Sequence, residues 1–168
     1  MITTPSVHKP FKAEYDKSAP LKLEWFGGNT NARDMCITIA AISQVWDDLI
    51  DKDEPVSDAQ IHHAFTLALV HLPANPFYQQ MQHLIRPMFI ASFAEYKVSI
   101  GFERNKDEHG LEIAHGLRFK LGSIFTLSVV LCVGEEKAAE YLPEVWKFIM
   151  SERFDDYRKE HMLTGASK

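Results

Sequence analysis

The stretch TNARDMCITIAAISQVWDDLID, residues 30–51, decides the fold class of this chain. Apolar residues recur in it at steps of three and four, which is the period of an α-helix. Small and β-branched side chains widen the apolar face, so we expect this helix to lie centrally in the protein. Asn29 or Thr30 can cap its first turn, and Pro55 follows its last turn as a stop signal.

Helical patterns continue along the rest of the chain. Ser57 and Gln60 form a capping box at the start of the next helix. Pro87 is expected to kink or break a long third helix near Arg86, and Pro143 is a point of interruption in the last one. Few segments alternate as β-strands do, so the predicted fold is an all-α bundle of five or six helices. The segments expected after the first helix are 58–71, 76–102, 111–133 and 135–160.

The length of 168 residues fits one domain. Residues 1–28 are dense in proline and glycine, which predicts an irregular N-terminal arm. Aromatic side chains such as Trp25 and Phe26 would pack this arm on the body. Residues 29–162 are expected to form a single helical domain, and residues 163–168 a frayed tail.

Charge and hydropathy narrow the class of protein. The net charge of −5 argues against general nucleic-acid binding, which usually requires a basic face. The longest apolar run, residues 121–133, is shorter than the roughly 18 residues of a membrane span. The first residues lack the layout of a signal peptide. These features predict a cytoplasmic protein with no membrane partner.

The first helix ends in a D-D-x-x-D motif made by Asp47, Asp48 and Asp51. Asp47 and Asp51 are four residues apart, so they share a helix face and repel each other. They also lie at the helix C-terminus, where the dipole disfavours negative charge. A magnesium ion would offset both effects, because carboxylate oxygens are its preferred ligands. The alternative is a solvated helix end without a metal.

A second acidic cluster lies in SERFDDYRKEH, residues 151–161, and contains Asp155, Asp156 and Glu160. If the first and last helices end at the same rim, the two clusters would face one cavity and hold a metal–phosphate group. Arg153 and Arg158 would then contact the phosphate. The alternative is the exposed side of a terminal helix, which is what a charge run usually indicates.

The segment EIAHGLRFK, residues 112–120, offers further candidates. Glu112 and His115 have the E-x-x-H spacing of di-iron bundles, but the second pair that such sites need is missing. Arg118 could bind a phosphate or carboxylate group. It could also form an ion pair within the chain, either with Glu112 or with the acidic rim.

The D-D-x-x-D motif on an apolar helix resembles the first aspartate-rich motif of class I isoprenoid (terpenoid) synthases. These enzymes are all-α and bind magnesium diphosphates. The resemblance implies an isoprenoid-synthase-like bundle, although this chain is shorter than such synthases and lacks the asparagine–serine–glutamate motif of the cyclases. It also implies Mg²⁺ held by Asp47, Asp48 and Asp51 from the first cluster and Asp155, Asp156 and Glu160 from the second.

The stretch WFGGNTNARDMC…VWDDLIDKDEPVS…LPANPFY, within residues 25–78, is similar to small helical proteins encoded by phages and prophages. That resemblance implies the cytoplasm of a bacterial host cell. The expected function is a phage-type accessory protein with an acidic metal rim that binds a phosphorylated or diphosphate ligand. The expected ligand contacts are Arg118, Arg153, Arg158 and His115.

The alternative function is a non-catalytic binding protein that sequesters a host protein or a signalling nucleotide, in one version as a homodimer. The sequence leaves open whether the protein catalyses a reaction.

Overall fold

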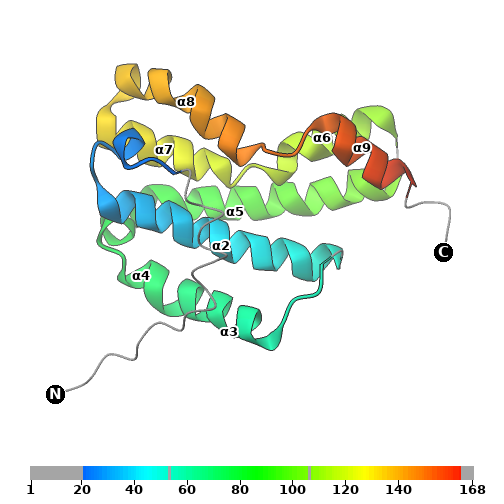
Figure 1. Ribbon diagram of the computed structural model, residues 1–168, viewed down its shortest axis with the longest axis horizontal. Helices are drawn as coiled ribbons and strands as arrows, with labels where there is room; N and C mark the ends of the chain where they lie inside the picture. Colours follow the sequence, from blue (N-terminus) through cyan, green and yellow to red (C-terminus); the bar gives the residue numbers. More distant parts are fainter. Residues whose placement is uncertain (1–20, 53, 106, 164–168) are drawn as a thin grey trace.

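The computed structural model describes residues 21–52, 54–105 and 107–163 (Figure 1). Residues 1–20 of the predicted arm and residues 164–168 of the predicted tail lie outside this part. Within the described ranges every regular element is helical, so the all-α prediction is confirmed. The elements are η3 (Leu23–Phe26), α2 (Thr30–Asp51), α3 (Asp58–Thr66), the π-helical η4 (Leu67–His71), α4 (Leu72–Ala74), α5 (Pro76–Asn105), α6 (Glu108–Arg118), α7 (Gly122–Val133), α8 (Glu135–Ile149) and α9 (Phe154–Leu163).

Helix α2 has the bounds that its sequence predicts, because both ends are fixed locally. The side chain of Asn29 accepts a hydrogen bond from the backbone N–H of Ala32 at 3.0 Å, which caps the first turn. At the other end Lys52 adopts a left-handed conformation (φ 60°) and donates to the carbonyl of Asp48 at 3.0 Å. The predicted capping box of Ser57 and Gln60 then starts α3.

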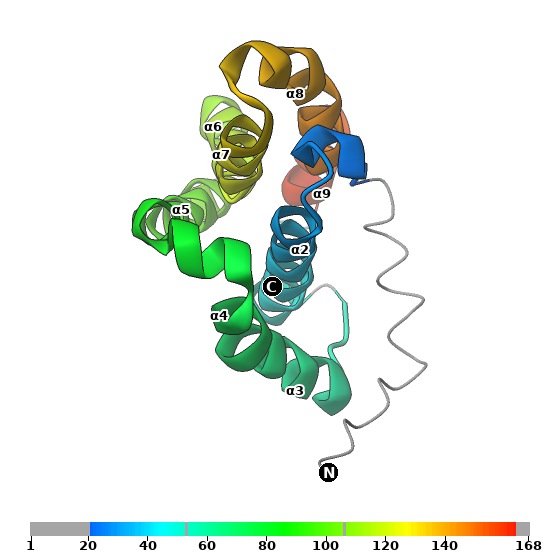
Figure 2. The ribbon, with the colours of Figure 1, turned by 90° about the vertical axis from the view of Figure 1, so that its left-hand side faces the viewer.

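The position of α2 is central, as expected (Figures 1 and 2). Helices α3 and α4 lie on one side of it, and α5 and the α7–α8 hairpin lie on the others. Met35 and Ile39 of α2 are buried in one apolar core with Ile85 of α5 and with Ile124 and Val129 of α7. Burying each such side chain contributes about 1.5–3 kcal/mol to folding.

Helix α5 runs through Pro87 without a break, so of the predicted kink or break near Arg86 the break is wrong. Pro87 and His83, four residues before it, are both exposed. Solvent can therefore bond the carbonyl that loses its helical partner, and the helix tolerates the proline. This continuity carries α5 from the start of the bundle to Asn105 at its far end.

The helix expected over residues 111–133 is divided into α6 and α7, which meet at an angle of 42°. Gly122 opens α7 where that helix approaches α8. A Cβ atom at this position would lie only 2.7 Å from Cγ2 of Ile149, so glycine is needed for the close contact. The bend leaves Arg118 as the last residue of α6, beside the end of α2.

The last predicted helix is also divided, but not at Pro143, which lies inside α8. The break comes after Ile149, and α9 starts at Phe154. Helix α9 packs on α6 through a second, smaller core, in which Leu111 and Tyr157 are buried. Across the described residues no single helix has the length and hydropathy of a membrane span; α6 and α7 reach them only when taken together.

Candidate functional site

Arg118 lies at the centre of a cluster of carboxylates. Its Nη2 atom bonds Oδ1 of Asp47 at 2.7 Å and also bonds Asp51, both from the last turns of α2. Its Nη1 atom bonds Oε1 of Glu103, from α5, at 3.1 Å. The Arg118 side chain is only 12% exposed. One largely buried guanidinium is therefore shared by three carboxylates, of which Glu103 is buried and Asp47 and Asp51 are partly exposed.

Two tyrosine hydroxyls complete this Arg118 cluster. The hydroxyl of Tyr96, on α5, donates to Oδ1 of Asp47. The hydroxyl of Tyr157, on α9, donates to Oε1 of Glu103 at 2.6 Å. Burial and the neighbouring carboxylates raise the pKa of both tyrosines, which keeps them protonated as donors. The cluster thereby joins α2, α5, α6 and α9.

Burial acts in opposite directions on the pKa values of the acidic and basic members of the cluster. Burial raises the pKa of Asp47, and this outweighs the opposite effects of Arg118 and of the Tyr96 hydroxyl. Burial alone would lower the pKa of Arg118, but Asp47 and Asp51 together raise it above its ordinary value. Arg118 is therefore always charged, and the carboxylates depend on it because a buried charge without a partner is costly.

The D-D-x-x-D motif thus meets a cation that the chain itself supplies. Asp47 and Asp51 share a face, as predicted, and Arg118 is paired with this acidic rim rather than with Glu112. Asp48 points elsewhere and accepts a hydrogen bond from Gln44 at 2.8 Å. Among the described residues, no group of three or more histidine, cysteine, aspartate and glutamate side chains is arranged to hold a metal ion.

The motif as arranged therefore does not fit Mg²⁺, since a metal at Asp47 and Asp51 would have to displace the guanidinium of Arg118. Magnesium binding by this protein stays a prediction.

The second acidic cluster is placed differently. Asp155 and Asp156 are exposed on α9, where Asp155 lies 3.7 Å from Arg158 and Asp156 lies 3.3 Å from Lys159. Arg158 also bonds Glu108 at 2.7 Å. Neither Asp155 nor Asp156 is among the described residues that line the cavity beside Asp47. The two aspartate pairs are thus not brought together.

Glu160 and Arg153 are exposed as well. The negative charge of Glu160 still acts on the cavity, because it raises the pKa of Glu152. Burial is the largest cause of that raised pKa, and Arg118 opposes it. Of the acidic residues in 151–161, Glu152, which precedes α9, is therefore the one that the described cavity lining includes.

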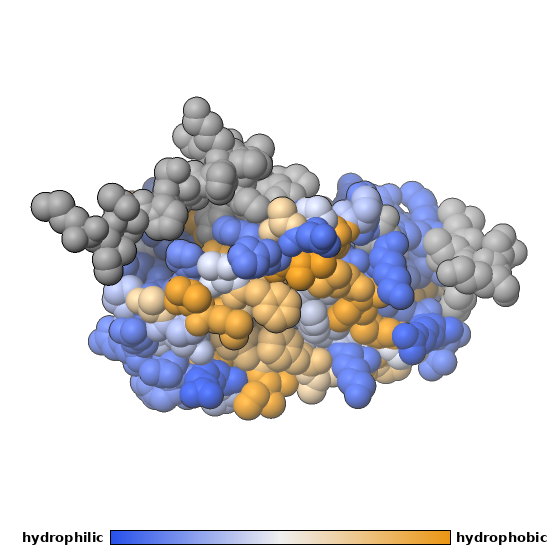
Figure 3. Space-filling model, turned by 90° about the horizontal axis from the view of Figure 1, so that it is seen from below, coloured by the Kyte–Doolittle hydropathy of each residue, from blue (hydrophilic) through white to orange (hydrophobic). Residues whose placement is uncertain are grey.

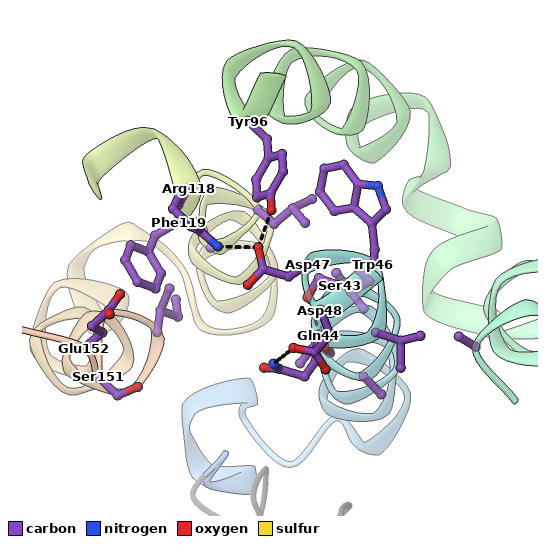
Figure 4. A pocket seen from close by; sticks show the side chains of 18 of the residues that line it. Ser43, Gln44, Trp46, Asp47, Asp48, Tyr96, Arg118, Phe119, Ser151 and Glu152 are labelled. Atoms are coloured by element: carbon purple, nitrogen blue, oxygen red, sulfur yellow. Dashed lines mark hydrogen bonds and ion pairs between the residues drawn. The ribbon is translucent and has the colours of Figure 1, made fainter. Parts of the chain in front are cut away.

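The cavity has a volume of about 770 Å³ and lies between α2, the start of α3, the α6–α7 bend and the end of α8. Figure 4 shows Glu152 and Ser151 facing Asp47 and Asp48 across it. Aromatic side chains form much of its apolar wall: Trp46, Phe119, Phe125 and Phe148. It therefore combines an apolar interior with an acidic rim.

His115 is not a cavity residue within the described lining, although the sequence analysis places it among the ligand contacts. It is buried in the second core, where its ring contacts Phe119, Phe154 and Tyr157. Its Nε2–H donates to the carbonyl oxygen of Glu152 at 3.2 Å. Burial lowers its pKa, so the neutral ring is favoured here.

Sequence reasoning missed Tyr96, Glu103, Glu152 and Tyr157. One signal was available: Tyr96 and Glu103 are seven residues apart, so they lie on one face of α5. A glutamate on the same helix face as buried residues indicates a buried cationic partner.

We compared the chain with known proteins in three ways and found no relative. No protein-family model, curated protein or solved structure matches this chain. The phage origin and the bacterial location that the resemblance implies therefore stay predictions, and the chain is described by its fold as a small all-helical protein.

Proposed function

We propose that this protein is a binding protein whose cavity takes a ligand with an apolar body and a positively charged group. The observation that carries the proposal is the charge of the cavity wall. Among the described residues, its lining includes one guanidinium, Arg118, and the carboxylates of Asp47, Asp48 and Glu152, on which the proposal rests; Glu54 also lines it. Since Arg118 is already shared with Asp51 and Glu103 outside the lining, an excess of negative charge faces the ligand.

The wall chemistry specifies the ligand further. An ammonium or guanidinium group gains from nearby carboxylates and from the faces of aromatic rings. Trp46, whose ring centroid lies 4.3 Å from that of Tyr96, and Phe119 supply aromatic surface close to the acidic rim. The rest of the apolar lining would cover the uncharged part of the ligand, as is usual in pockets of this size.

This belongs to the non-catalytic binding class that the sequence leaves open as an alternative, but with a small cationic ligand in place of a host protein or a signalling nucleotide. An anionic ligand would meet Glu152 and Asp48 as like charges. The polar groups with shifted pKa values in the Arg118 cluster are bonded to one another, which favours a structural role for them over a reaction at Asp47.

A second candidate is a divalent metal with a phosphate ligand. It is favoured by one observation, namely that Asp47, Asp48 and Glu152 all line the same cavity, and it requires these described side chains to move closer together than they now lie. A metal there would reverse the sign of the wall and admit a phosphate.

Calorimetric titration of the folded protein with three short-chain probes separates these candidates. The probes are hexyltrimethylammonium, hexanol and hexyl phosphate, each with and without magnesium. We expect the ammonium probe to bind about fivefold or more tightly than hexanol, because each cation–π contact or ion pair at a half-exposed site contributes about 1 kcal/mol. Hexyl phosphate that binds only with magnesium, while the ammonium probe does not bind, would establish the second candidate instead.

Variants at the rim test whether the cavity is the binding site. Glu152→Gln and Asp48→Asn should each weaken the ammonium probe several-fold and leave hexanol unchanged. Asp155→Asn, at an exposed aspartate outside the described lining, is the matched control and should change neither. Equal weakening by the control, or no binding of the ammonium probe to the wild type, contradicts the proposal.

A further inference from the structure

A second feature of the molecule is a broad exposed apolar surface outside the cavity. Seen from below, apolar side chains gather in a band across the face that α3 and α4 present (Figure 3). Eight large apolar residues are exposed on α2, α3, η4 and α5 between residues 49 and 93, and Ile50 and Leu84 are the least exposed of them. We call the other six the α3–α5 face: Leu49, Phe65, Leu69, Val70, Ile90 and Phe93. None of them is among the described residues that line the cavity.

The geometry of these helices explains why the face stays uncovered. Phe65 and Leu69 are four residues apart, so they point the same way from α3 and η4. Ala64 and Leu67 of the same segment are buried, and α3 packs on α2. This segment is therefore apolar on its inner side and also on its outer side, where Leu69 is 71% exposed. Exposed polar residues such as His62 share the outer side, but large apolar side chains gathered on an exposed surface normally mark an interaction site.

The opposite border of the face is formed by α5. Ile90 is 73% exposed, and Phe93 is about half exposed although its ring contacts Trp46 of α2 with centroids 5.1 Å apart. That contact ties the α5 part of the face to α2, which also carries Leu49. The face is therefore one surface built on three packed segments rather than scattered exposed residues.

We propose that a second copy of this chain covers the α3–α5 face and forms a two-fold symmetric dimer. The exposed parts of its six large side chains present on the order of 600 Å² of apolar surface, the upper end for a patch on a monomer. With a polar rim, that area matches the roughly 800 Å² that each partner buries in a stable interface. In a two-fold dimer one patch serves both partners.

The charges at the borders favour a second copy with α3 facing the partner's α5. Asp58 is exposed at the start of α3, whereas Arg86 and Lys97 are exposed on α5 on either side of Ile90 and Phe93. Pairing α3 with α5 across the two-fold axis brings opposite charges together at the rim. A lipid surface would use only the basic border and would be repelled at Asp58.

Light scattering coupled to size exclusion, and sedimentation over a range of concentrations, test the dimer. We expect the wild type to be a dimer at micromolar concentration. Phe65→Asp and Ile90→Asp should each weaken the dimer at least a hundredfold, since each would bury an unpaired charge in the interface. Leu131→Asp is the matched control, because Leu131 is 38% exposed on α7, away from the α3–α5 face, and it should stay dimeric.

A charge exchange makes the test specific for the proposed pairing. Asp58→Lys should weaken the dimer about tenfold, and adding Lys97→Glu should restore it. Circular dichroism and melting of each variant separate loss of the dimer from loss of the fold. A wild type that is monomeric at high micromolar concentration overturns the proposal, whether or not it floats with vesicles of anionic and neutral lipid. Equal dissociation of the Leu131→Asp control overturns it as well.

Discussion

The two acidic motifs of this chain look alike in sequence and differ in structure. Asp47 and Asp51 at the end of α2 are partly buried and share the guanidinium of Arg118. Asp155 and Asp156 at the start of α9 are exposed beside Arg158 and Lys159. The difference lies in where the cation comes from. The first pair is bonded by a residue about seventy positions away, whereas the second is neutralised by its own helix.

This comparison shows that a run of acidic residues does not by itself indicate a metal. A helix C-terminus that carries two carboxylates needs positive charge nearby, and either a metal ion or a distant arginine can provide it. Here the arginine does so at Asp47 and Asp51, and the metal-like pattern in the sequence has a structural explanation.

Replacing the central cation should have the largest effect. Arg118→Met leaves Asp47, Asp51 and Glu103 without their shared partner, and we expect a loss of about 3–5 kcal/mol in the free energy of unfolding, measured in urea. The matched variant Arg158→Met breaks two exposed ion pairs, with Glu108 and Asp155, and should cost less than about 1 kcal/mol. Similar losses in the two variants would contradict the distinction between the two clusters.

Removing the hydrogen bond that joins α9 to the Arg118 cluster should have the next largest effect on the free energy of unfolding. Tyr157→Phe removes the hydroxyl that bonds Glu103, and a buried hydrogen bond to a charged group contributes about 1.5–3 kcal/mol. We expect a loss of about 2 kcal/mol on urea unfolding, together with faster amide exchange in α9. Tyr78→Phe, at a half-buried tyrosine of α5, should cost less than about 0.5 kcal/mol. An unchanged exchange rate in α9 would mean that the hydroxyl does not hold this helix.

The pH dependence of stability that His115 causes should be a smaller effect. It tests the packing of the second core, which lies beside the Arg118 cluster. Because the folded state lowers the pKa of His115, the unfolded state binds the proton more readily. Stability from this group is therefore present above the unfolded pKa of about 6.5 and is lost as the pH falls below it. Arg118, whose charge also lowers this pKa, opposes protonation in the same direction.

Melting temperatures between pH 7.5 and 5 measure this effect. We expect the difference between wild type and His115→Asn to shrink by a few degrees toward the acid end, whatever its absolute size. His83→Asn, at an exposed histidine of α5, should leave the pH dependence unchanged. A constant difference between wild type and His115→Asn would place the pH dependence elsewhere, for example at Glu152 or Asp47, whose raised pKa values act with the opposite sign.

Sequence patterns predicted the local parts of this architecture and missed the long-range ones. The ends of α2 follow from Asn29 and from its apolar period, both of which act within a few residues. The bend between α6 and α7 depends on Gly122 meeting Ile149, and that contact has no local signature. The break predicted at Pro87 failed for a related reason, since whether a proline breaks a helix depends on its exposure in the folded protein.

The same limit applies to the site. Sequence reasoning named Asp47, Asp51 and Arg118 and considered an ion pair between Arg118 and the acidic rim, because charge type and spacing are visible in the sequence. It did not find Glu103 or Tyr157, because a buried glutamate and an exposed one have the same letter. Their pairing across fifty-four residues depends on how α5 and α9 pack.

The smallest effect is expected at the second acidic motif. Asp155→Asn and Asp156→Asn remove charges from the first turn of α9, where they suit the helix dipole and pair with Arg158 and Lys159. Both groups are exposed, so solvent screens these interactions and each variant should lose less than about 0.5 kcal/mol in urea unfolding. A loss comparable to that of Tyr157→Phe would show that this pair is as structural as the first. Added magnesium that stabilises the wild type but not Asp155→Asn would show that α9, rather than α2, carries a metal site.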